Sequence, residues 1–267
     1  MKIYNIIFKM GALIFIFGLV LGSFANVCIF RLPKGKSIIS PGSYCPNCKK
    51  PILWYDNIPL LSYIILKGRC RYCNKKISPR YFIVELLTGV LFFLIYKNFG
   101  LTSSFFIYSI FILSLIIVGF IDIDTFLISD VVVIPCILLG LIFSFAFPHI
   151  HNLSGNFESF IYSFEGILLG GGVLILLSFA GKIAFKKDAM GGGDVKLLAM
   201  IGSFLGWKCV FLTLFFGSLF GTIISLILIG LKKRKIEDYV PFGPYLGLGA
   251  VISLFFKGHD FLGFFIN

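Results

Sequence analysis

The fold is decided by the segment LTSSFFIYSIFILSLIIVGFIDIDTFLISD, residues 101–130. Residues 101–121 carry no charge, and three aspartates follow before the segment ends. An uncharged helix of that length is long enough to cross the hydrocarbon core of a bilayer. The whole chain of 267 residues is 58% hydrophobic, contains 33 Phe and is only 13% charged. This composition is typical of a helical protein that crosses the membrane several times.

Similar apolar stretches recur along the chain, and they predict an all-α polytopic membrane protein with about eight transmembrane helices. The expected spans are residues 10–30, 81–96, 101–121, 131–147, 159–181, 197–207, 209–231 and 239–256. The sixth span is too short unless its helix begins near Asp194. The first span lacks a small-residue cleavage site, so it is not expected to be a removed signal. The predicted organisation is a first transmembrane helix in 1–30, a cytoplasmic loop in 31–80 and a seven-helix core in 81–267.

The net charge of +12 is concentrated between particular spans. Residues 31–80 contain 11 Lys and Arg but one acid, Asp56, and such a loop stays on the cytoplasmic side. With eight spans, the basic segments 182–196 and 232–235 also become cytoplasmic, which places 19 of the 24 Lys and Arg there. Both termini are then expected outside the cytoplasm. Because orientation accounts for the charge, it predicts contact with the lipid bilayer and no nucleic-acid binding.

Four cysteines in the basic loop form two C-x2-C pairs, CPNC and CRYC, with 21 residues between the pairs. The ligand candidates are Cys45, Cys48, Cys70 and Cys73. This spacing is typical of a zinc-ribbon-like site in which four thiolates hold one structural Zn²⁺. Disulfides are disfavoured in a cytoplasmic loop, and a thioredoxin-type pair would need a βαβ pattern. The other three cysteines lie in apolar runs and are interpreted as buried small side chains.

A second unusual stretch, AMGGGDVKLLAM at residues 189–200, places Asp194 at the mouth of an apolar segment. The predicted topology puts Asp194 on the same membrane face as Asp122, Asp124 and Asp130. Two facing carboxyl groups that share a proton can hydrolyse a peptide bond, one as general base and the other as acid. Gly191 and Gly193 would let a substrate backbone come close. The alternative is that these aspartates only cap helices.

Two glutamates in apolar segments are interpreted differently. Glu165 is expected near the outer end of its span, where water is accessible. Glu85 lies close to Arg80, so a helix-end or ion-pair role is as reasonable as chemistry.

Five stretches together resemble one family, the bacterial prepilin peptidases or type IV leader peptidases, which are GxGD membrane aspartyl proteases. The stretches are GSFANVCIFRLPKGKSIISPGSYCPNC at 22–48, WYDNIPLLSYIILKGRCRYCNKKISPRYFIVELLT at 54–88, IDIDTFLISD at 121–130, MGGGDVKLLAMIGSFLGW at 190–207 and PFGPYLGLGA at 241–250. The resemblance implies an enzyme of the bacterial cytoplasmic membrane that cleaves the basic leader from prepilins and pseudopilins at the cytoplasmic face. Many members then methylate the new N-terminus with S-adenosylmethionine.

The family patterns place the catalytic pair on Asp122, through D-x5-[IL]-P-[DN], and on Asp194, through GxGD. Asp124 and Asp130 become supporting acids, and the cysteine pairs match the long form of the family. This chain has Ser129 where the family has proline, and a serine can cap the following helix instead. No glycine fingerprint for a nucleotide is present, so the methyl transfer is implied by the resemblance alone.

Three other functions remain open from the sequence. The chain could be a peptidase without methyltransferase activity. Its acids could serve a proton-coupled transporter, although a transporter would place them near the middle of the membrane. Its cysteine loop could make it a zinc-ribbon scaffold for a partner protein.

Overall fold

The computed structural model describes residues 2–185, 191–232 and 240–256. These residues form α-helices and short 3-10 helices, and they contain no β-strand beyond two isolated bridges. The predicted all-α fold is therefore confirmed. The chain divides into two compact units, residues 1–117 and 118–267, with the boundary inside α4 (Ser103–Thr125).

The first unit is built on the pairing of α1 (Lys2–Arg31) with α3 (Arg80–Phe99). Glycines bring the two helices together: a Cβ added at Gly18 would lie 2.8 Å from the Cα of Gly89. Small residues allow such close contact between helices that have no hydrophobic drive to associate in lipid. The rings of Phe92 and Phe105 then join α3 to the first part of α4, with their centroids 6.4 Å apart.

The long connection between α1 and α3 holds two 3-10 turns, η1 (Leu32–Lys34) and η2 (Trp54–Asn57), and the short helix α2 (Leu61–Ile65). Its first part is held by the buried side chain of Arg31, which donates hydrogen bonds to the carbonyls of Ser37, Pro41 and Gly42. Its second part is held by the buried Glu85 of α3, whose carboxylate accepts the N–H of Leu60 at 2.9 Å. Glu85 therefore has a structural contact with the loop, which neither of its two interpretations had specified.

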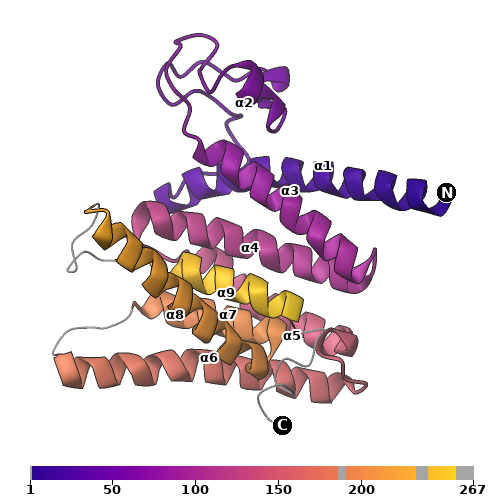
Figure 1. Cartoon of the computed structure of the whole chain (residues 1–267), viewed down its shortest axis with the longest axis vertical. Helices are drawn as coiled ribbons and strands as arrows, with labels where there is room; N and C mark the ends of the chain where they lie inside the picture. The colour runs from indigo at the N-terminus through magenta and orange to yellow at the C-terminus, as the bar shows by residue number, and fades with distance from the viewer. Residues whose placement is uncertain (1, 186–190, 233–239, 257–267) are drawn as a thin grey trace. The chain divides into compact units, whose positions relative to one another are not determined.

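The second unit contains α5 (Asp130–Ala146), η3 (Pro148–His151), α6 (Asn156–Phe185), α7 (Gly192–Leu205), α8 (Trp207–Gly230) and α9 (Gly243–Phe256). Helix α7 is the centre of this unit, since it packs against α5, α6, α8 and α9 (Figure 1). Every residue of α7 from Leu197 to Leu205 is buried. A short apolar helix surrounded in this way needs little lipid contact of its own.

Helices α6 and α7 approach each other closely through glycine on both sides. A Cβ added at Gly202 would collide with the carbonyl group of Gly166, and a Cβ at Gly166 with that of Gly202. One turn further along α6, a Cβ at Gly170 would meet the Leu198 carbonyl carbon at 2.9 Å. The hydroxyl of Ser163 donates to the carbonyl of Ser203 across the same interface. Backbone contact of this kind requires residues without side-chain bulk.

Five described helices are long and apolar enough to cross a membrane, namely α1, α3, α4, α6 and α8. The remaining three predicted spans correspond to the shorter helices α5, α7 and α9. Helix α7, which corresponds to the sixth predicted span, begins at Gly192. This start lies close to Asp194, as expected, because residues 197–207 alone are too short to cross a bilayer. The predicted end of this span at Trp207 is wrong, because Gly206, with φ of 78°, ends α7 and Trp207 begins α8. The start of the last span at Tyr239 lies outside the described residues.

The glycine contact between α6 and α7 predicts a selective loss of stability. Gly202→Ala should reduce the free energy of unfolding by about 1–3 kcal/mol, because the added methyl overpacks a backbone contact. Gly172→Ala on α6 is the matched control, since its Cβ would meet no atom within 4 Å. Thermal unfolding in detergent measures both variants. Equal melting temperatures would contradict the proposed packing.

Candidate active site and metal centre

Asp122 and Asp194 meet inside the second unit. Asp122 lies near the end of α4 and Asp194 in the first turn of α7. Asp122 is only 4% exposed and Asp194 only 6%, although a carboxylate normally stays in water. The charge of Asp122 acts directly on Asp194. Two buried carboxyl groups near enough to repel each other are most stable when only one is ionised, and one carboxylate beside one carboxylic acid is the arrangement needed for acid–base chemistry.

The carboxylate of Asp122 is held by a third element, helix α9. The backbone N–H of Gly243, the first residue of α9, donates to Oδ2 of Asp122 at 2.9 Å. Gly119, one turn before Asp122 on α4, lies against the same end of α9, because a Cβ there would be 3.7 Å from the Cα of Pro244. The PFGP stretch at 241–244 therefore belongs to this site, a role that sequence reasoning did not assign to it.

Asp194 occupies the third position of α7, whereas Gly191 occupies the N-cap position. The interpretation of Asp194 as an N-cap residue is therefore wrong. Its carboxylate instead reaches back to the N–H of Gly191, and its own N–H donates to the Gly191 carbonyl at 3.1 Å. These bonds fix the start of α7 in the manner of a capping box. They also hold the Asp194 carboxyl group within electrostatic range of Asp122.

The glycines before Asp194 have unequal surroundings. A Cβ at Gly193 would lie 2.8 Å from Cβ of Ile128, while a Cβ at Gly192 would meet nothing within 4 Å. Gly193 thus allows the segment between α4 and α5 to pack against the start of α7. Sequence reasoning missed Ile128, because nothing in its local pattern marks it as a partner of the glycine run.

The other two acids are exposed, unlike the buried pair. Asp124 lies two residues beyond Asp122, on an exposed part of α4. Asp130 begins α5 and receives both hydrogen bonds of the Lys196 ammonium group, at 2.9 and 2.8 Å. This ion pair connects α5 to α7 beside the site. Sequence reasoning did not predict it, and the only local signal was that Lys196 lies two residues after Asp194.

Ser129 stands at the N-cap position of α5, but its hydroxyl makes no capping hydrogen bond. The prediction that serine replaces the family's proline through a side-chain cap is therefore wrong. The Ser129 carbonyl instead accepts the N–H groups of Val132 and Val133, both at 3.1 Å. The first turn is further favoured by the negative charge of Asp130.

The four loop cysteines converge on one point in the first unit. The Sγ atoms of Cys45, Cys48, Cys70 and Cys73 all lie within 4.8 Å of one another. Cys45 and Cys73 are 3.9 Å apart, and Cys48 and Cys70 are 4.0 Å apart. A tetrahedral ion with bonds of about 2.3 Å to sulfur requires separations of about 3.8 Å. The donor set and its geometry therefore fit a closed four-thiolate metal site, with no position left for a substrate.

The two cysteine pairs are built by the same backbone turn. In the first, the Cys45 N–H donates to the Lys50 carbonyl and the Lys49 N–H to the Cys45 carbonyl. In the second, the Cys70 N–H donates to the Lys75 carbonyl and the Asn74 N–H to the Cys70 carbonyl. Lys49 and Asn74 both adopt positive φ, of 59° and 58°. Such turns aim backbone N–H groups at the sulfurs.

Nearby groups also adjust the charge of this loop. The N–H groups of Cys73 and Tyr72 stabilise the Cys70 thiolate and lower the pKa of Cys70 to about 7, whereas desolvation and the neighbouring thiols raise the pKa of Cys73 to about 11. The Arg71 guanidinium donates to both carboxylate oxygens of Asp56, at 2.7 and 2.6 Å, and lowers the pKa of that carboxyl. Asp56, the one acid of the loop, thus holds the second cysteine pair against η2.

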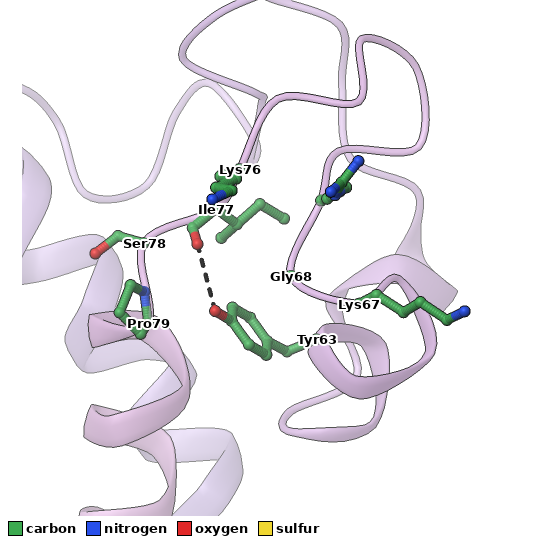
Figure 2. Close-up of a pocket in the computed structure, with 8 residues that line it drawn as sticks. Tyr63, Lys67, Gly68, Lys76, Ile77, Ser78 and Pro79 are labelled. Carbon is green, nitrogen blue, oxygen red and sulfur yellow. Dashed lines mark hydrogen bonds between the residues drawn. The ribbon is translucent and has the colours of Figure 1, made fainter.

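A shallow hollow of about 450 Å³ lies beside the second cysteine pair. Figure 2 shows Tyr63 within it, with the hydroxyl donating to the Ile77 carbonyl at 3.4 Å and Lys67 pointing away from the ring. Gly68 has φ of 64°, and a Cβ there would lie 2.9 Å from the Tyr63 hydroxyl. The hollow is lined by Tyr63, Lys67, Gly68, Arg69, Lys76, Ile77, Ser78 and Pro79.

Two family models match the chain. Residues 16–99 match the bacterial peptidase A24 N-terminal domain, and residues 109–226 match the type IV leader peptidase family. No solved structure matches the chain.

Three relatives carry the name prepilin leader peptidase/N-methyltransferase. The protein of Aeromonas salmonicida is 36% identical over 91% of this chain and 89% of its own length. That of Neisseria gonorrhoeae is 35% identical over 89% and 87%, respectively. That of Myxococcus xanthus is 36% identical over 81% of this chain but 62% of its own length. With the matched domains covering both the cysteine loop and the buried aspartates, the chain belongs to the type IV leader peptidase family.

Proposed function

We propose that this protein is a membrane aspartyl endopeptidase that removes the basic leader from prepilins and pseudopilins. The observation that carries the proposal is the buried pair of Asp122 and Asp194, contributed by two different helices. Family membership supplies the substrate class, and the names of the relatives agree with it. Asp122 and Asp194 are the proposed catalytic residues, while Asp124 and Asp130 are supporting acids.

The chemistry begins with one carboxylate and one carboxylic acid in the pair. The carboxylate takes a proton from a water molecule, whose oxygen attacks the scissile carbonyl carbon, while the acid protonates the carbonyl oxygen. The resulting tetrahedral diol then collapses. The first carboxyl group gives its proton to the leaving nitrogen as the C–N bond breaks, and the second regains a proton from a diol hydroxyl. Both groups return to their starting states without a covalent intermediate.

The proposed substrate carries an apolar helix. The predicted substrate anchors itself in lipid by that helix and would reach the site sideways from the membrane. Gly191 and Gly193 are proposed to lie beside its unwound backbone. Gly192, where an added Cβ meets nothing, leaves room next to them.

We place the reaction at the cytoplasmic face of the bacterial inner membrane. The support is the distribution of Lys and Arg, which favours a cytoplasmic position for residues 31–80 and for the segments near Asp194. In this orientation both termini are extracytoplasmic. The basic leader of a prepilin would then be held on the side where positive residues normally remain. Residues 1–30, 31–80 and 81–267 act as the first span, the metal loop and the membrane core.

The second proposed activity is methylation of the new N-terminal amine, with S-adenosylmethionine as methyl donor. The relatives' shared name supports it. When bound, S-adenosylmethionine supplies an electrophilic methyl group. The protein has to present the leader-free amine in its neutral form, since a protonated amine has no lone pair for the methyl.

The thiolate cluster is proposed to hold structural Zn²⁺. Its four sulfurs fit a closed tetrahedral site, and a loop of this size has too few apolar residues to fold around a core of its own. The ion would fix the two turns against each other. It would take no part in peptide hydrolysis.

Two rival functions leave observations unexplained. A proton-coupled transporter would place paired acids along a path through the membrane, whereas Asp122 and Asp194 lie at the end of one helix and the start of another. A zinc-ribbon scaffold would have no use for a buried pair of carboxyl groups. The matched family also favours the peptidase.

Substitution of the aspartates tests the peptidase directly. Asp122→Asn and Asp194→Asn should each lower cleavage of a prepilin with a basic leader by at least about 1,000-fold, because an amide cannot exchange the proton. Asp124→Asn is the comparison variant: Asp124 is exposed and only a supporting acid, so its replacement should lower cleavage far less than replacement of either member of the buried pair. The product's new N-terminus, read by mass spectrometry, identifies the bond that is cut.

Two outcomes would contradict this assignment. If the Asp122 and Asp194 variants cleave as fast as wild type, the aspartyl mechanism is wrong. If wild type leaves prepilins intact but binds a partner through the cysteine loop, the scaffold function gains support instead.

The same product tests methyl transfer. With S-adenosylmethionine added, wild type should yield a leader-free pilin heavier by one methyl group at its N-terminal residue. A methyl-free product at saturating donor would show that this chain is a peptidase alone. Pre-cleaved pilin offered to Asp194→Asn separates the two reactions, because methylation of that substrate needs no hydrolysis.

Metal analysis tests the loop. Purified protein should contain one equivalent of zinc, and Cys45→Ser should lose most of it because three thiolates bind less tightly than four. Cys28→Ala, which removes a buried thiol from α1, is the control and should retain the metal. The metal content is measured by inductively coupled plasma mass spectrometry. Equal zinc in both variants would exclude the four-thiolate site.

A further inference from the structure

Gly243 stands at a position where two observations coincide. Its N–H donates to Oδ2 of Asp122, and the same oxygen would lie 2.7 Å from a Cβ added to Gly243. The Cγ and Cβ atoms of Asp122 would also be close to that Cβ, at 3.3 and 3.4 Å. The Asp122 carboxylate therefore occupies the space that any side chain at position 243 would need.

The hydrogen bond follows from the way α9 begins. The first N–H groups of a helix have no acceptor inside the helix. In α9 the N–H groups of Tyr245 and Leu246 reach the carbonyl of Phe242, at 3.1 and 3.0 Å, and Pro244 has none to satisfy. The N–H of Gly243 is directed out of the helix, and Asp122 supplies its buried acceptor. The positive end of the α9 dipole also favours a carboxylate there.

From this geometry we infer that Gly243 is a positioning residue for the peptidase reaction, holding Asp122 through its backbone N–H and through the absence of a side chain. The inference rests on the proposed function of Asp122 as a catalytic residue. It makes the PFGP stretch a third element of the active site, together with the ends of α4 and α7. The Gly243 N–H uses one acceptor position of Oδ2, and the remaining acceptor positions of the Asp122 carboxylate are left for water or substrate.

A distinctive pattern of effects follows from replacing Gly243 by alanine. The backbone of Gly243 is not in the left-handed region, so alanine is compatible with the helix itself. The clash falls on the end of a side chain that can rotate, not on a rigid backbone. Gly243→Ala should therefore fold normally and displace the Asp122 carboxylate. Activity should fall while stability does not.

Helix α9 contains two further glycines that serve as matched controls. A Cβ at Gly247 would meet no atom within 4 Å, so Gly247→Ala adds the same methyl without touching Asp122. A Cβ at Gly249 would collide with the carbonyl of Thr213 on α8, so Gly249→Ala reports what damage to helix packing does. Each of the three variants adds one methyl group to the same helix, at a different position.

The experiment measures kcat and KM for a prepilin, together with the melting temperature, for wild type and the three variants in detergent. Gly243→Ala should lower kcat by about 10- to 100-fold, the usual effect of losing one hydrogen bond to a charged group. Its KM and melting temperature should match those of Gly247→Ala. The positioning role is overturned if Gly243→Ala cleaves as fast as Gly247→Ala. It is equally overturned if Gly243→Ala is destabilised as much as Gly249→Ala and its kcat falls only as much as that of Gly249→Ala.

A readout without substrate separates this inference from the proposed function. Infrared spectroscopy assigns the carboxyl band of Asp122 by its absence in Asp122→Asn. That band should shift in Gly243→Ala and stay unchanged in Gly247→Ala, because only the first variant breaks the N–H bond to the carboxylate. An unshifted band in Gly243→Ala would refute the contact even in a protein that cleaves prepilins. A shifted band would support it even if wild type cleaves none of the prepilins offered.

Discussion

The second unit depends on the backbone contact between α6 and α7 at Gly166 and Gly202. In a bilayer two apolar helices gain little from hiding their surfaces from water, so their association relies on close packing and on hydrogen bonds between them. The glycines allow the closest packing, and the hydroxyl of Ser163 adds a hydrogen bond to Ser203. Helix α7 can then lie among α5, α6, α8 and α9, and Asp194 is carried into the interior on its first turn.

The pair of carboxyl groups is assembled from three helix ends. Asp122 comes from the end of α4, Asp194 from the start of α7, and the N–H of Gly243 from the start of α9. Helix starts suit this purpose because they offer unpaired N–H groups and a favourable dipole to a buried negative charge. The exposed pair of Lys196 and Asp130 contributes little energy, as surface ion pairs do, but it connects α7 to α5 beside the site.

The cysteine loop is stabilised in a different way from the second unit. It has no core, so two identical turns and one metal site take the place of a core. Arg31 and Glu85, charged residues at the ends of α1 and α3, attach the loop to the helices through buried hydrogen bonds. Glu85, which sequence reasoning left open between a helix-end or ion-pair role and chemistry, thus makes one of the two contacts that attach the loop to its flanking helices.

The amino-acid sequence was sufficient to predict the helical class, the approximate spans and the cysteine cluster, and its family patterns suggested Asp122 and Asp194 as a pair. These features depend on apolar length, on C-x2-C spacing and on family patterns, all of which are local or carried by short motifs. Only the tertiary structure decided that Asp124 is exposed, that Asp194 is the third residue of α7 and not its cap, and that Ser129 makes no side-chain cap. It also decided that Ile128 packs on Gly193 and that Gly243 binds Asp122. The physical reason is that these contacts join residues from different helices, and which face of each helix turns inward is set by packing between helices, which no local pattern records.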